Sequence, residues 1–85
     1  MKLIDTIEMM KSEDYKERFK AEYYQTKIRN DKLYNMIAKY KAGNLDFEPI
    51  CQLDVLEEQF NYMSGYLRIL EIRAKLEKIE LWKIY

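Results

Sequence analysis

The sequence predicts an all-α fold: a short N-terminal helix, then a long antiparallel helical hairpin, completed by homo-oligomerisation. Residues 12–43 carry a stripe of side chains spaced alternately four and three apart, and residues after 53 repeat helical spacing on two faces. The chain has only two glycines and one proline, which leaves little material for turns. We expect a single helical domain over residues 1–85, with helices at about 2–10, 13–42 and 55–81.

The long helix carries a seven-residue pattern. Its stripe consists of Phe19, Tyr23, Thr26, Asn30, Leu33, Ile37 and Tyr40. Such a stripe keeps one face of a helix against a partner helix. Ser12 is a suitable N-cap, and Gly43 can supply the left-handed residue that ends the helix. Thirty residues make a rod of about 45 Å, which has to pair along its length.

The middle of this stripe is polar, at Thr26 and Asn30. A polar pair on an apolar seam costs stability unless it is hydrogen-bonded. In one interpretation the asparagine fixes the register of the helices and the oligomeric state. In the other, both residues line a small polar pocket between helices, with Tyr23 and Arg29 beside them. With Tyr66 added from the third helix, the predicted ligand-binding residues are Tyr23, Thr26, Arg29, Asn30 and Tyr66.

The third helix carries two apolar stripes, and Asp54 is predicted to cap its start. The first stripe holds Leu56, Phe60, Met63, Leu67, Leu70 and Ala74, and the second holds Val55, Tyr62, Tyr66, Ile69, Ile72, Leu76 and Ile79. One stripe is enough to pack on the long helix, so the second needs another partner. We expect the short first helix to cover part of it and a subunit interface to cover the rest. Gly65 either lets a neighbouring helix approach closely or opens space for a ligand.

The remaining segments are expected to cover the ends of the hairpin. Residues 2–10 are too short to be helical alone and must lie on another element. They form either a lid over the core or a segment that orders when a partner binds. Residues 44–53, with apolar Phe47 and Ile50, are expected to fold back over the helix ends, leaving Cys51 buried or half-buried. The apolar residues of 82–85 either dock on a neighbour or fray.

Composition excludes several classes of protein. Lysine plus arginine total 15 and aspartate plus glutamate total 15, and this balance argues against a protein that coats DNA. The chain has no histidine, the commonest general base and metal ligand, and a single cysteine. It has no glycine-rich phosphate loop and no serine nucleophile motif. We therefore expect a protein that is not an enzyme, with no catalytic residue, no cofactor and no metal site.

The sequence also favours a cytoplasmic protein with no membrane partner. The apolar run at the N-terminus is too short for a signal peptide and contains Asp5 and Glu8. No window approaches the roughly 20 apolar residues of a membrane-spanning helix. A single cysteine suits a reducing compartment.

Tyrosine is conspicuous, with eight copies in the chain. Its large ring and polar tip suit the edge of a small core or an interface. The same rings could instead stack on nucleotide bases, as they do in proteins that bind single-stranded nucleic acids. Lysines and arginines of the long helix lie near them in sequence and could neutralise phosphates.

The segments YKERFKAEYYQTKIRNDKLYNMIAKYKAG and LEEQFNYMSGYLRILEIRAKLE resemble small proteins of phages and prophages of Gram-positive bacteria. The layout is also similar to the helical-hairpin phage sponges that counter CBASS defence. The matching pieces are LYNMIAKY, the short loop, and the run of Gln59, Met63 and Leu67. The resemblance implies a short helix before two long antiparallel helices, a symmetric oligomer, and a protein that sequesters a cyclic nucleotide messenger without cleaving it.

Two functions follow as hypotheses. The first is a non-enzymatic phage counter-defence protein that binds a cyclic di- or trinucleotide in the cytoplasm of an infected bacterial cell. The alternative is a helical protein-protein interaction module that inhibits or adapts a host factor. RNA or DNA binding through the basic side of the long helix is a weaker third hypothesis.

Overall fold

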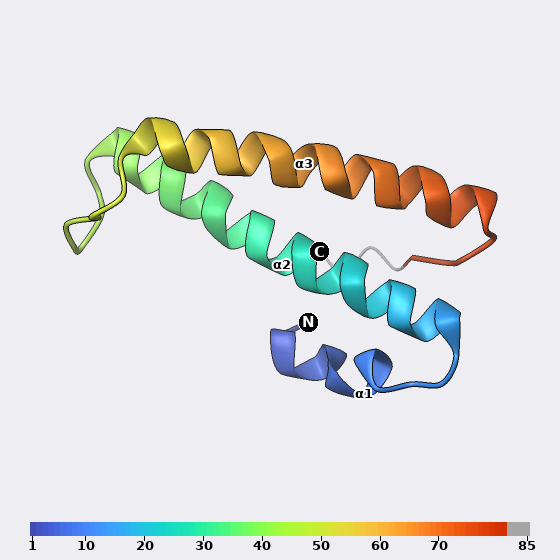
Figure 1. Cartoon of the computed structure of the whole chain (residues 1–85). Helices are drawn as coiled ribbons and strands as arrows, with labels where there is room; N and C mark the ends of the chain where they lie inside the picture. The colour runs from blue at the N-terminus through green and yellow to red at the C-terminus, as the bar shows by residue number, and fades with distance from the viewer. Residues whose placement is uncertain (82–85) are drawn as a thin grey trace.

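The computed structural model describes residues 1–81, and its regular elements in that range are all helices. A 3₁₀ turn, η1 (Leu3–Thr6), runs into α1 (Ile7–Met10). The long helices α2 (Tyr15–Ala42) and α3 (Leu53–Leu76) follow, joined by a loop. Figure 1 shows them side by side and antiparallel, so the expected all-α hairpin is confirmed. No helix of this part of the chain is long and apolar enough to cross a membrane.

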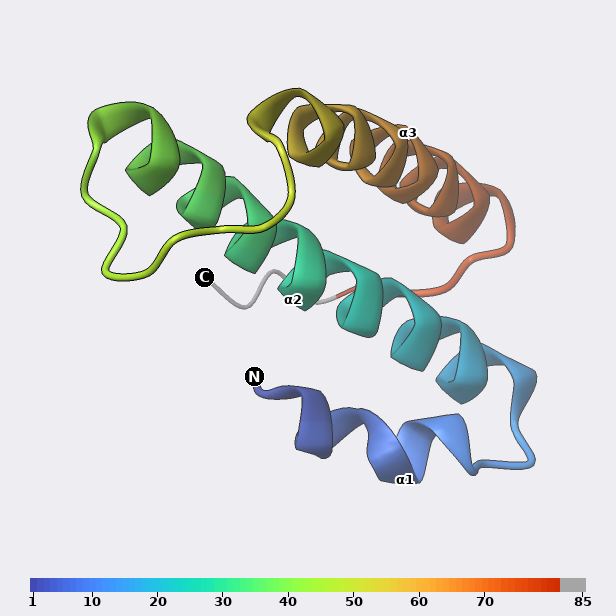
Figure 2. The same cartoon turned by 60° about the vertical axis from the view of Figure 1, so that its left-hand side comes forward.

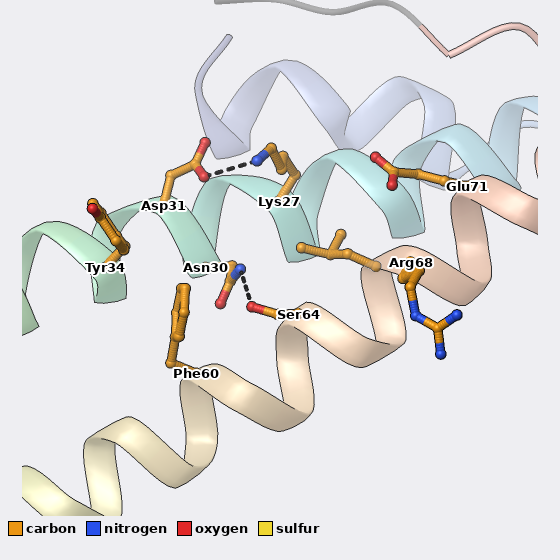
Figure 3. A pocket seen from close by; sticks show the side chains of 9 residues that line it. Lys27, Asn30, Asp31, Tyr34, Phe60, Ser64, Arg68 and Glu71 are labelled. Atoms are coloured by element: carbon orange, nitrogen blue, oxygen red, sulfur yellow. Dashed lines mark hydrogen bonds and ion pairs between the residues drawn. The ribbon is translucent and has the colours of Figure 1, made fainter.

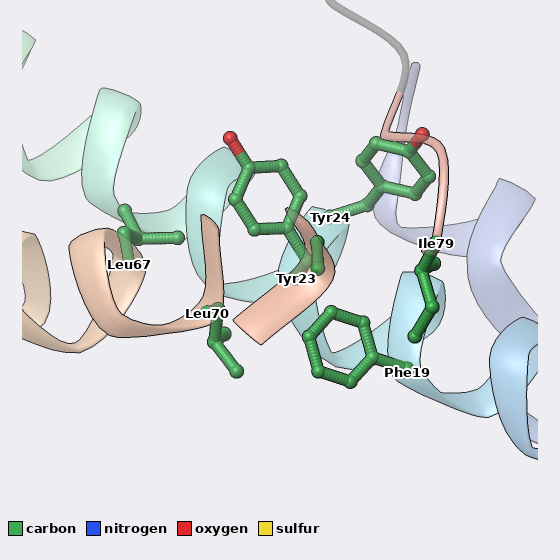
Figure 4. Packing of buried hydrophobic residues seen from close by; sticks show 7 residues of the cluster. Phe19, Tyr23, Tyr24, Leu67, Leu70 and Ile79 are labelled. Carbon is green, nitrogen blue, oxygen red and sulfur yellow. The ribbon is translucent and has the colours of Figure 1, made fainter. Parts of the chain in front are cut away.

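The predicted heptad stripe of α2 packs against the first apolar stripe of α3. Phe19, Tyr23, Asn30 and Ile37 of α2 are buried, and Leu56, Leu67, Leu70 and Ala74 of α3 are buried with them. The main cluster lies toward the start of α2 and the end of α3 (Figure 4). Burial of apolar area along this seam is the principal force that holds the hairpin closed.

Helix α3 ends five residues earlier than the expected 81. The amides of Lys78 and Ile79 donate to the carbonyls of Lys75 and Ala74, which forms a Schellman motif after Leu76. Lys78 takes the left-handed conformation there, with φ of 57°. This turn sends Ile79 back onto the cluster of Phe19, where it is 5% exposed. The expected docking or fraying of residues 82–85 lies outside the described residues.

Both long helices also begin where the sequence did not predict. Asp14, not Ser12, caps α2, because its carboxylate accepts from the Lys16 amide at 3.0 Å. The Ser12 hydroxyl accepts from the Asp14 amide instead. Helix α3 begins at Leu53 rather than 55, so Asp54 lies inside its first turn, where a negative charge favours the helix dipole. The end of α2 at the left-handed Gly43 is as predicted.

The N-terminal segment packs on α2, and its backbone does not approach that of α3 (Figure 2). Its Met9 packs against the main cluster, so the segment does not cover the second stripe of α3 as expected. Thr6 is fully buried in this contact. Its hydroxyl donates to the Leu3 carbonyl at 2.7 Å and accepts from the Gln25 side chain at 2.9 Å. These two bonds join the short segment to the flank of α2 that faces away from the hairpin seam.

Two further expectations are corrected, and a third, the close approach of a helix at Gly65, is not met within the described residues. Phe47 and Ile50 are exposed, so the 44–53 loop does not fold these two side chains over the helix ends, whereas Leu45 and Leu53 are half-buried. Cys51 in the same loop is exposed, not buried or half-buried. A Cβ atom placed on Gly65 would meet nothing within 4 Å, so no helix of the described chain approaches it closely.

Candidate ligand pocket between the two long helices

A cavity of about 340 Å³ lies between α2 and α3, near the middle of the hairpin (Figure 3). It is lined by Lys27, Asn30, Asp31 and Tyr34 from α2, and by Phe60, Ser64, Leu67, Arg68 and Glu71 from α3. The four residues of α2 are spaced three, one and three apart, which places them on one face of the helix. The volume lies at the lower end of the roughly 300–1,000 Å³ typical of small-molecule sites.

Asn30 is the buried polar group of this pocket, at 5% exposure. Its Nδ2 donates to the Ser64 hydroxyl at 3.2 Å, and its Oδ1 is buried with no hydrogen-bond partner in the described structure. Figure 3 shows the amide between Ser64 and the Phe60 ring. If the side-chain amide of Asn30 is flipped by 180°, the Ser64 hydroxyl donates to the amide oxygen, and the amide nitrogen is left without a partner instead. The pocket therefore holds one unsatisfied hydrogen-bonding group, which costs about 1–3 kcal/mol.

Two aromatic rings form the end of the pocket nearest the loop. The centroids of Tyr34 and Phe60 lie 5.7 Å apart, with their planes at 42°. Tyr34 is 58% exposed, so much of its ring area is free to contact a ligand. Exposed aromatic faces beside a polar group suit a planar ligand such as a nucleotide base.

The charged lining residues are balanced in number. Lys27 pairs with Asp31 at 3.1 Å on the α2 side, and Glu71 accepts from the Tyr23 hydroxyl at 2.8 Å. Arg68 makes no ion pair within residues 1–81, and Figure 3 shows its guanidinium directed away from α2. A flexible arginine without an ion-pair partner can turn toward an anion bound at the rim. Among the same residues, no group of three His, Cys, Asp or Glu side chains could hold a metal ion.

Of the five residues predicted from the sequence, Asn30 lines this pocket. Tyr23 lies in the packed core (Figure 4), where its hydroxyl reaches Glu71. Thr26 donates to the Glu22 carbonyl of its own helix at 2.8 Å. Arg29 is exposed on α2, and Tyr66 is 42% exposed on α3.

The sequence did contain a signal for the residues that were missed. Lys27, Asp31 and Tyr34 lie three, one and four positions from Asn30, so they share its side of α2. Ser64 is the polar interruption of the core-facing side of α3, opposite Asn30 in the hairpin. Matching the polar residue that interrupts the apolar face of α2 with the one that interrupts the apolar face of α3 would have located the pocket. Reading the heptad stripe alone selected Thr26, which bonds within its own helix.

The fold and the pocket define a helical-hairpin protein with a polar site between its two long helices. Residues 13–76 match the model of the Sequestin family, and this match covers more than half of the chain and every residue that lines the pocket. The chain therefore belongs to the Sequestin family, and the match fits the resemblance to small helical sponge-like proteins. No curated protein and no solved structure matches the chain.

Proposed function

We propose that this protein binds a cyclic oligonucleotide immune messenger in the Asn30 pocket and sequesters it without cleaving it. The observation that carries the proposal is the unsatisfied amide of Asn30, buried beside the exposed ring of Tyr34. The name of the family, Sequestin, denotes sequestration, and it supports a function based on binding rather than catalysis. The resemblance to the phage sponges supports a nucleotide as the ligand.

In this proposal each pocket holds one base. The unpaired Oδ1 of Asn30 accepts a hydrogen bond from an amino group of the base, since its Nδ2 already donates to Ser64. Tyr34 stacks on the ring, and Arg68 turns to a phosphate at the rim. A cavity of about 340 Å³ suits one nucleotide unit, so the remaining units of a cyclic di- or trinucleotide lie outside this pocket.

The proposed setting is the cytoplasm of an infected bacterial cell, where a phage protein would remove the messenger of an antiviral defence. Sequestration requires binding sites in at least equal number to the messenger. Self-association, which the second stripe of α3 supports, would place several pockets on one particle.

The test is a thermal-shift titration with cyclic di- and trinucleotides, alongside the matching mononucleotides and linear dinucleotides. A ligand at 100 times its Kd should stabilise the fold by about 2.7 kcal/mol. Heating the complex and analysing the released nucleotide by chromatography should recover it intact. Recovery of a cleaved product would contradict sequestration, and no shift with any nucleotide would remove the nucleotide proposal.

Two variants test whether the nucleotide binds in this pocket. Tyr34→Ala should weaken nucleotide binding about 5- to 150-fold, because base stacking on an aromatic ring contributes about 1–3 kcal/mol. Arg29→Ala is the matched control, since Arg29 is an exposed cation of the same helix that does not line the pocket. Equal loss in both variants would indicate general charge or helix effects rather than this pocket.

The alternative function is a helical interaction module that inhibits or adapts a host protein. The exposed apolar stripe of α3 favours it, because a large unpaired apolar face marks an interaction surface. Capture of a defined host protein, lost when the stripe is made polar and unaffected by Tyr34→Ala, would favour this alternative over the nucleotide proposal.

A further inference from the structure

The face of α3 that points away from α2 forms a strict seven-residue repeat. Val55, Tyr62, Ile69 and Leu76 follow one another at intervals of seven and are 51%, 72%, 45% and 77% exposed. Tyr66 and Ile72 widen the same face, at 42% and 44% exposure. A repeat of seven keeps a seam against one partner helix over several turns. Helix α3 therefore has one heptad seam for α2 and a second seam with no partner in the described chain.

A glycine marks the midpoint of this second seam. Gly65 lies between Tyr62 and Ile69, and the space beyond its α-carbon is open. Glycine inside a helix costs about 1 kcal/mol relative to alanine, and no contact within the described chain offsets that cost. Absence of a side chain at the centre of an apolar seam allows two helix backbones to approach closely, as small residues do at other helix crossings.

The distribution of charge along α3 favours one orientation of a partner helix over the other. The first half, residues 53–64, holds three carboxylates and no lysine or arginine: Asp54, Glu57 and Glu58. The second half, residues 65–76, holds three cations and one carboxylate: Arg68, Arg73, Lys75 and Glu71. Two copies of α3 side by side in the same direction would oppose like charges. Antiparallel copies oppose unlike charges at both ends, and their helix dipoles also favour this direction.

We propose that α3 pairs with α3 of a second copy of this chain, antiparallel, about a two-fold axis that passes between Gly65 and Tyr66. This axis sets Tyr62 against Ile69 of the partner subunit, and Val55 against Leu76 of the partner subunit. Glu58 and Lys75 are exposed and make no ion pair within residues 1–81. The axis places Glu58 near Lys75 of the partner subunit, and the pair occurs twice because the interface is isologous.

The interface and the pocket are separate. Pocket residues of α3 such as Ser64 and Leu67 face α2, whereas the second seam faces outward. Nucleotide binding and dimer formation can therefore fail independently. A dimer that binds no nucleotide would overturn the proposed function alone, and a monomer that binds one would overturn this inference alone.

Cysteine cross-linking tests the orientation. In the full chain with Cys51→Ser, one variant adds Tyr66→Cys and another adds Leu76→Cys. The two copies of residue 66 lie beside the axis, so the first variant should form a disulfide-linked dimer on mild oxidation. The two copies of residue 76 lie roughly 30 Å apart along the helices, so the second should not. Adding Val55→Cys to Leu76→Cys should restore cross-linking. Cross-linking by Leu76→Cys alone would overturn the antiparallel arrangement.

Light scattering and sedimentation test the seam itself. Ile69→Asp should weaken self-association at least 100-fold, because it buries two carboxylates in an apolar contact. Its helical circular dichroism should persist, since Ile69 is half exposed in the single chain. The control is Ile50→Asp, an equal change at a fully exposed loop position, which should leave the dimer intact. A wild-type chain that sediments as a monomer at millimolar concentration would overturn the proposal.

A charge exchange gives a second measurement. Glu58→Lys should weaken the dimer about tenfold, because two ion pairs become two repulsive contacts. Adding Lys75→Glu to the same chain should restore the original affinity. If the double variant does not regain the original dimer affinity, Glu58 does not lie near Lys75 of the partner subunit, and the proposed axis is excluded.

Discussion

Asn30 shows how one residue can serve both interpretations that the sequence left open. Its amide donates to Ser64 at 3.2 Å across the two long helices, which is the kind of contact expected of a buried asparagine that sets helix register. The other end of the same amide is buried and unsatisfied, so it also supplies the polar group of a pocket. Thr26, the other half of the predicted polar pair, does neither, because its hydroxyl bonds to its own helix.

If the unsatisfied amide exists for a ligand, removing it should make the empty protein more stable. The double variant Asn30→Leu with Ser64→Ala should raise the free energy of unfolding by about 1–2 kcal/mol, from removal of the unpaired group and from better helix propensity. Urea denaturation measures this change. Thr26→Val, a shape-matched control on the same helix, should change stability by less than about 0.5 kcal/mol. A marked loss of stability in the double variant would contradict the unsatisfied state of the amide.

At the scale of the element, the helices were predictable and their ends were not. Spacing alone determines which side chains share a face, so the stripe of α2, the first stripe of α3 and the second stripe as far as Leu76 were predicted, whereas Ile79 was wrongly assigned to the second stripe. The end of α3 was missed because Ile79 and Leu81 continue the apolar spacing, although the chain has already left the helix. Lysine at the left-handed position of a Schellman motif gives no sequence signal, unlike Gly43 at the end of α2.

This lysine offers a direct test of the helix end. Lys78→Gly should stabilise the fold by about 1 kcal/mol, because glycine adopts a positive φ without the steric cost that other residues carry. Lys78→Ala is the control and should give little gain, since alanine carries the same Cβ. Equal unfolding free energies for the glycine variant and the wild type would show that Lys78 is not held in the left-handed conformation.

The position of the pocket was also only partly predictable at this scale. Asn30 could be selected because it interrupts an apolar stripe. The other residues that line the pocket could not be selected from the sequence, because they lie on the flanks of two helices. Which residues of the two flanks face each other depends on how far one helix is shifted along the other. The docking of the N-terminal segment on α2 was missed for a similar reason. Its few apolar residues fit either long helix, and the sequence does not show that Gln25 bonds to Thr6 or that Met9 packs on the main cluster.

At the scale of the whole molecule, a polar cluster closes the open end of the hairpin, where α2 begins and α3 ends (Figure 1). The Tyr15 hydroxyl donates to Glu77 at 2.6 Å, and Arg73 donates to Glu77 at 2.9 Å and to Tyr15 at 2.8 Å. The Arg73 guanidinium also lies 5.1 Å from the centre of the Phe19 ring. Hydrogen bonds from Tyr15 and Arg73 hold the pKa of Glu77 below its ordinary value, and the bond to Glu77 raises the pKa of Tyr15.

These shifts predict how the cluster responds to pH. A lowered pKa means that the stability from Glu77 is present above its unfolded pKa and is lost as the pH falls through the folded value. The difference in melting temperature between wild type and Glu77→Gln should therefore be largest near pH 7 and shrink below about pH 4.3. The raised pKa of Tyr15 works in the opposite direction, so the difference from Tyr15→Phe should shrink above about pH 10.

The control for this measurement is Glu80→Gln. Glu80 is exposed and makes no hydrogen bond or ion pair within the described residues, so its difference from wild type should stay near zero across the same range. A difference for Glu77→Gln that does not vary with pH would show that the cluster is open in solution.

The exposed Cys51 has a practical consequence for measuring the whole assembly. It is the single thiol of the chain and lies in the loop, apart from the residues that line the pocket. A dye attached there marks one known point on each copy without altering the pocket or the second seam. In the antiparallel pair, two such dyes would stand roughly 40 Å apart, whereas parallel copies would bring them together. Energy transfer between the two dyes would then report the orientation and the exchange of subunits in solution.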